Sequence, residues 1–253
     1  YKLYGHLEDD VNYNLFAGTD AGSGITTGSD NIAIGCSAGR NLTTGFNNVF
    51  LGKNAGIGYT DSCNAIAIGH SAGSSSNARG NVYIGESAGK LHGVNSSNNS
   101  WNVFIGSQSG ENAVCSTASV VVGRRSGQSL NDGDVNVLIG CSAGSSLIDG
   151  DYNVFLGRLA GSGATTGNQN IFLGNQVGFY GSSAGGCCNI LMGTAASLTG
   201  TTTSNNSIVF GTAARAEGSY NIVFGNSVIL PAGNTQLAIG CGSSRWIYGD
   251  SNF

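Results

Sequence analysis

Short apolar runs recur along the chain at a nearly constant spacing. Each run has the form x-Φ-x-Φ-Gly, where Φ is an apolar residue, and ten of the runs open on asparagine, as in NVFLG at Asn48–Gly52. Fourteen runs align on their glycines, from Gly18 to Gly240, and the commonest step is 17 residues. Short apolar runs bounded by glycine favour strands, and a short fixed period is typical of solenoids. The pattern predicts an all-β parallel β-solenoid (β-roll or β-helix) of about 14 coils of about 17 residues each.

Three further columns of the repeat have predicted roles. The third residue after the motif glycine is small, as at Ala38 and Ala55, and is expected to face a narrow coil interior. The glycine that follows, Gly39 or Gly56, suits a corner with positive φ. The asparagine that opens ten of the fourteen runs is expected to stack on its neighbours in an amide ladder.

The middle residue of each run predicts an oligomer. If the two Φ residues face the coil interior, the middle residue faces out, and it is apolar in every copy. So long an apolar stripe exceeds what a soluble monomer usually exposes. We therefore expect a homo-oligomer, most simply a trimer, although the strand could instead lie between two sheets of a wider single-chain coil. The expected interface residues are Phe16, Phe50, Tyr83, Phe104, Val121, Leu138, Phe155, Phe172 and Leu191.

The regularity of the repeat divides the chain into three parts. Residues 1–11 precede the first copy and are expected to form a cap or linker. Residues 12–178 hold the regular repeats, whereas 179–253 hold degenerate coils and a transition to a cap or another domain. One step of 21 residues contains an insertion, Val94–Trp101, which predicts a protruding loop. Trp101 either packs or contacts a surface ligand there.

Composition narrows the function. The net charge of −4 provides no basic surface for nucleic acid, and no apolar run is long enough for membrane insertion. Seven cysteines without a CxxC pair disfavour a disulfide framework and a zinc site. The three histidines form no paired motif, and neither a P-loop nor a nucleophile elbow is present. These observations predict a protein that is not an enzyme.

One group of carboxylates raises the question of a metal. The sequence DGD occurs at Asp132–Asp134 and again, 17 residues later, at Asp149–Asp151. Stacking would bring the four carboxylates Asp132, Asp134, Asp149 and Asp151 together, and calcium would relieve their repulsion. Two solvated turns are the simpler interpretation, because aspartate is common in turns. No other cofactor is expected.

The repeats resemble known surface fibres. Units such as NIAIGCSAG and NVLIGCSAG are similar to the head repeats of trimeric autotransporter adhesins, which are trimers of β-rolls; the resemblance covers roughly residues 12–240. The unit here is longer and has a second glycine. The ending NTQLAIGCGSSRWIYGDSNF more closely resembles repeat-rich, tail-fibre-like structural proteins of viruses that infect cyanobacteria and other aquatic hosts. Both resemblances imply an elongated surface structure concerned with attachment.

The leading hypothesis is a structural rod of a virion or extracellular fibre that attaches to a host or surface, where it would meet a glycan or protein. An alternative is a subunit of a self-assembling extracellular filament, in which the apolar stripe would bury in an open helical array. A weaker alternative is a glycan-binding or glycan-processing spike.

Overall fold

The computed structural model describes residues 12–93, 100–178, 186–199 and 203–250. Within these ranges the protein is all-β, with no helix. Each of the fourteen predicted motif copies forms a strand, and neighbouring strands pair in parallel with a shift of one repeat, as the period predicts. The parallel β-solenoid is confirmed. The chain divides into two compact units, the first ending at Asp132 and the second beginning at Gly133.

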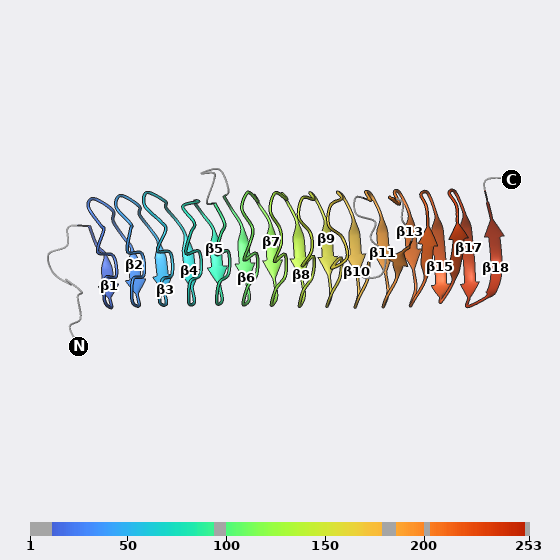
Figure 1. The fold of residues 1–253 in the computed structure, drawn as a ribbon, viewed down its shortest axis with the longest axis horizontal. Helices are drawn as coiled ribbons and strands as arrows, with labels where there is room; N and C mark the ends of the chain where they lie inside the picture. Colours follow the sequence, from blue (N-terminus) through green and yellow to red (C-terminus); the bar gives the residue numbers. More distant parts are fainter. Residues whose placement is uncertain (1–11, 94–99, 179–185, 200–202, 251–253) are drawn as a thin grey trace. The chain divides into compact units, whose positions relative to one another are not determined.

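The first unit contains seven strands of three residues each. Successive strands pair in register, so that Val49, Phe50 and Leu51 lie opposite Ile66, Ala67 and Ile68. In Figure 1 these strands follow one another in chain order from blue to green. Their bounds are β1 (Leu15–Ala17), β2 (Ile32–Ile34), β3 (Val49–Leu51), β4 (Ile66–Ile68), β5 (Val82–Ile84), β6 (Val103–Ile105) and β7 (Val120–Val122).

The second unit contains a column of parallel strands of the same kind and a second, smaller sheet. The column contains β8 (Val137–Ile139), β9 (Val154–Leu156), β10 (Ile171–Leu173), β11 (Ile190–Met192), β13 (Ile208–Phe210), β15 (Ile222–Asn226) and β17 (Leu237–Cys241). The smaller sheet consists of β12 (Ser197–Leu198), β14 (Arg215–Glu217) and β16 (Ile229–Ala232). A final strand, β18 (Ser244–Gly249), pairs antiparallel with β17 and ends the parallel series.

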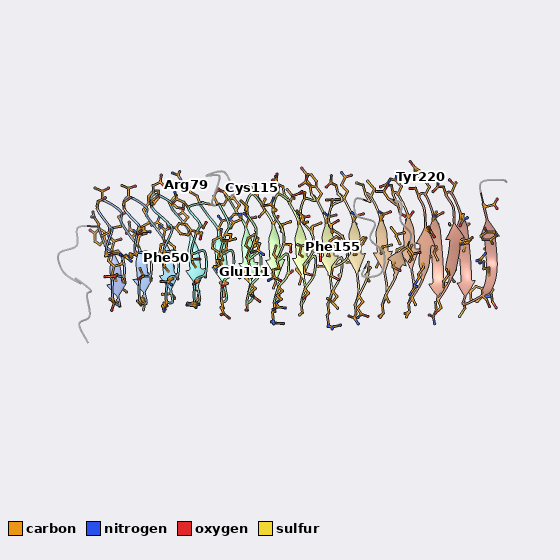
Figure 2. All side chains as sticks on the ribbon, in the orientation of Figure 1. Phe50, Arg79, Glu111, Cys115, Phe155 and Tyr220 are labelled. Atoms are coloured by element: carbon orange, nitrogen blue, oxygen red, sulfur yellow. The ribbon has the colours of Figure 1, made fainter. Side chains whose placement is uncertain are left out.

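The facing of the strands is the reverse of the prediction. The middle residue of each strand lies inside the coil, and the two flanking residues face outward. Figure 2 labels Phe50 and Phe155, two of these middle residues. The predicted interface residues therefore belong to the core: Phe50, Tyr83, Phe104, Val121, Leu138, Phe155, Phe172 and Leu191 are buried, and Phe16 is half-buried in the first described coil.

Glycine and small residues make the room that these rings occupy. The small column is buried as predicted, as at Ala38 and Ala55, but it shares the interior with the middle residue. Gly39 and Gly56 lie on the two sides of the Phe50 ring, and a Cβ on Gly56 would come within 2.5 Å of it. Both glycines have positive φ, 54° and 60°, which confirms the predicted corner. The coil is thus wide enough for an aromatic ring because its corners carry no side chain.

A second interior position lies nine residues after the middle residue of the strand. Its size varies from coil to coil: Phe104 is followed by the small Ala113 and Ala33 by Leu42, whereas Phe50 is followed by Tyr59. All six side chains are fully buried. Phe50 and Tyr59 fill the interior together, with their ring centroids 5.0 Å apart.

A ladder of buried asparagines joins consecutive coils, as predicted. The Asn153 amide donates to Asn136 Oδ1 at 3.1 Å and to the Gly167 carbonyl at 2.9 Å. Its own oxygen accepts the backbone N–H of Asn170 at 3.0 Å. Asn31 and Asn48 repeat this arrangement in the first unit. The ladder therefore satisfies buried backbone groups where the chain enters each strand.

Candidate interaction surface

The outward residues of the strands form a broad apolar surface on each unit. We define the outer face as the first and third residues of β1–β7 in the first unit and of β8–β11, β13, β15 and β17 in the second. Every one of them is apolar. Seven of them are exposed, up to 42% at Ile34, and the others are half-buried. Neighbours align along the face, and the rings of Phe210 and Phe224 stack at 5.2 Å with an angle of 2°.

The outer face is bordered by mainly polar residues on one side and by a mixture of polar and aromatic residues on the other. After the motif glycine of the first unit, the bordering positions include Lys53, His70 and Glu86, all three exposed. Just before the run, they include the exposed Asn47 and Asn64 and the exposed aromatic residues Tyr13 and Trp101. An apolar centre with a polar rim is the usual composition of a protein–protein interface. The geometry therefore marks the outer face as a candidate interaction surface.

Trp101, predicted as a surface-ligand residue, is exposed at this rim. Its side chain is 68% exposed, and its backbone N–H contacts the Arg79 carbonyl at 3.4 Å. A Cβ on Gly80 would approach the ring to 2.8 Å, so the indole lies over the backbone of the preceding coil. The residues just before it, 94–99, are the greater part of the predicted insertion and lie outside the described residues.

Calcium binding by the four aspartates stays a prediction. Asp151 uses one carboxylate oxygen to accept the backbone N–H of Asp134 at 2.8 Å, and Asp151 in turn donates its own N–H to Asn168. Asp149 is exposed in the second unit, and Asp132 is exposed at the end of the first. Among the residues with a described position, no three His, Cys, Asp or Glu side chains are placed to hold a metal ion. The calcium hypothesis gains no support from this geometry.

A buried polar network was not foreseen from the sequence. His92 is fully buried; its Nδ1 lies 2.6 Å from the Tyr83 hydroxyl, and its Nε2 lies 2.9 Å from the Ser116 carbonyl. These partners fit a neutral imidazole whose Nε2–H donates to the carbonyl while Nδ1 accepts from tyrosine. Burial lowers the pKa of His92 to about 4, although the Ser116 contact acts in the opposite direction. The network is a core element, since no outer-face residue takes part in it.

Comparison with known proteins adds little beyond the fold. No protein-family profile and no curated protein matches the chain. A search of solved structures finds an Arabidopsis UDP-N-acetylglucosamine acyltransferase, at 15% identity and a TM-score of 0.21, with 91% of this chain and 69% of that one covered. So low a TM-score carries no argument about this chain. In the ranges described here, no helix is long and apolar enough to cross a membrane. The chain is thus a β-solenoid repeat protein whose most distinctive surface is the outer face.

Proposed function

We propose that this protein is a structural, non-enzymatic part of an oligomeric fibre on a virion or cell surface, and that the fibre serves in attachment. The observation that carries the proposal is the outer face. On each unit it extends over seven strands without a charged residue on its first and third positions. Such a surface is costly to leave in water, and its regular spacing suits a partner with the same repeat.

The outer face sets the scale of a contact between copies. Seven strands spaced about 4.8 Å apart and about 10 Å long give each unit an area on the order of 300 Å². Each unit by itself therefore presents less than half of the roughly 800 Å² that each partner buries in a standard interface. The polar rim supplies the border that excludes water from such a contact.

A second copy of this chain is the occupant that we favour. Its strands have the same spacing, so its Val, Ile and Leu rows interdigitate with those of the first copy along the whole contact. One apolar face on each unit suits a closed assembly, because an open filament needs two different complementary surfaces. The resemblance to trimeric β-roll heads favours three copies. The same resemblance, together with that of residues 234–253 to viral tail-fibre-like proteins, supports a place on a fibre.

The test is the mass of the protein in solution. Mass photometry of the wild type should give three times the chain mass of 25.5 kDa. The variant Ile34→Asp/Ile68→Asp/Ile105→Asp puts one charge on each of three outer-face strands and should give single chains with an unchanged circular dichroism spectrum. A matched control, Thr27→Asp/Asn41→Asp/Thr44→Asp, adds the same charge at exposed turn positions and should keep the trimer. A wild type that is monomeric would refute the proposal, and open-ended polymers would favour the filament.

A further inference from the structure

The first unit contains a second surface feature whose chemistry differs from that of the outer face. Phe46, which is 44% exposed, precedes β3, and the exposed Trp101 precedes β6, so the two aromatic residues are three coils apart. The exposed amides of Asn47 and Asn64 lie on the coil of Phe46 and on the next coil, with the Asn47 Nδ2 at 3.4 Å from Asn64 Oδ1. An aromatic residue therefore stands at each end of this stretch of coils, and the paired amides belong to the coils at its Phe46 end.

The backbone holds these residues at a fixed spacing. Asn64 donates its N–H to the Phe46 carbonyl at 3.1 Å, and Gly80 donates to the Cys63 carbonyl at 3.1 Å. Each step between coils is about 4.8 Å, so Phe46 and the coil beneath the Trp101 ring are roughly 10 Å apart. The Trp101 ring is supported from below by Gly80. A ligand would meet a preorganised surface and would not need to order it.

Charged groups at this surface are few and compensate one another. Asp61 accepts the Asn77 amide at 2.8 Å and the Thr60 hydroxyl at 3.2 Å. These hydrogen bonds, chiefly that of Asn77, and the nearby Arg79 guanidinium lower the pKa of Asp61, which keeps it ionised. Arg79, labelled in Figure 2, is exposed and projects from the outside of its coil. The surface thus offers donors and acceptors without an excess of either charge.

We propose that Trp101, Phe46, Asn47 and Asn64 form a binding site for a neutral, linear oligosaccharide lying along the stack of coils. A sugar ring has an apolar C–H face, which packs on an aromatic ring, and a rim of hydroxyl groups. A side-chain amide donates and accepts at once, so it can pair with neighbouring hydroxyls. The surface lacks the net positive charge that a phosphorylated or acidic ligand would need. This inference names the ligand class for the attachment function proposed above and rests on it.

The test measures binding of four probes, cellohexaose, xylohexaose, mannohexaose and chitohexaose, by isothermal titration calorimetry. We expect at least one to bind the wild-type protein and Trp101→Ala to weaken that binding by about tenfold or more, the effect of losing one aromatic anchor. Trp246→Ala is the matched control, because Trp246 is also exposed, at 73%, but lies in the second unit. It should bind as the wild type does.

Three results would overturn this site. They are failure of all four probes to bind the wild type, binding by Trp101→Ala equal to that of the wild type, and loss of the oligomer in Trp101→Ala, which would make Trp101 a contact between copies. A wild type that assembles but binds no probe refutes the sugar site and leaves the fibre proposal standing. A wild type that is monomeric but binds a probe through Trp101 refutes the fibre proposal and leaves the sugar site standing.

Discussion

Removing one amide from the asparagine ladder should cost far more stability than its small size suggests. In the second unit Asn153 lies between Asn136 and Asn170, and all three are buried. The Asn153 side chain donates to Asn136 Oδ1 and to the Gly167 carbonyl, and it accepts both the backbone and the side-chain N–H of Asn170. Asn153→Ala deletes these four hydrogen bonds at once.

The cost follows from the groups left behind. The Asn170 backbone N–H loses its acceptor, and the Gly167 carbonyl loses the Asn153 amide. Each buried group that loses its partner costs about 1–3 kcal/mol, so the free energy of unfolding of the second unit should fall by about 4 kcal/mol. Asn153→Ser should recover part of this loss, because in the natural chain Ser207 Oγ accepts the backbone N–H of Asn221 at 3.1 Å.

Guanidinium denaturation followed by circular dichroism would measure these differences. Hydrogen exchange at the Asn170 amide would show whether the loss begins at the ladder, since repeat proteins can open locally. Asn175→Ala is the control, because Asn175 is exposed, and it should change stability by less than about 0.5 kcal/mol. If Asn153→Ala and Asn175→Ala are equally stable, the ladder does not hold the coils together as argued here.

Two further predictions concern the core. Gly56→Ala should destabilise the first unit by more than about 2 kcal/mol, because it adds a clash with the Phe50 ring to the strain of a left-handed residue. Gly242→Ala is the control: Gly242 has a similar φ of 57° and no atom within 4 Å of its added Cβ, so the variant should cost only the strain. Equal shifts of the melting temperature in the two variants would refute the clash. The buried His92, with its pKa lowered from 6.5 to about 4, should make the protein less stable in acid. The unfolded chain takes up the proton first, so about 3 kcal/mol should be lost as the pH falls from 6.5 to 4. His92→Gln should abolish this component of a melting-temperature profile, and an unchanged profile in that variant would assign the acid sensitivity elsewhere.

The sequence predicts the parallel solenoid, the ladder and the positive-φ corners because each depends on a repeated residue type. It predicts the wrong facing of the strands because a three-residue strand that is apolar on both faces has no polar residue to mark the outside. The prediction that Phe50 faces the opposite side from Val49 and Leu51 is correct, but Phe50 faces the coil interior and its two neighbours face outward.

The network around His92 could not be predicted for a different reason. Tyrosine occurs at the middle position of a strand only at Tyr83, and histidine occurs nine residues after that position only at His92. A prediction based on the repeat cannot identify a pair of residues that occurs in one coil. Their contact depends on the way two adjacent coils fill a shared volume. Trp101 could be recognised as unusual from its place after the insertion, but its support by Gly80 required the stacking of the coils to be known.

The asparagine ladder also bears on how such a chain changes length. The bonds from Asn153 to Asn136 and from Asn170 to Asn153 are the same, at 3.0 Å for the backbone and 3.1 Å for the amide. In this stretch, each coil therefore makes the same hydrogen bonds with the coil that follows it as with the coil that precedes it. Duplication of residues 153–169 would create no new kind of junction, and the molecule would grow by about 4.8 Å. Duplication of whole repeats in the gene can therefore lengthen the protein in fixed steps, while the contacts within the existing coils stay the same.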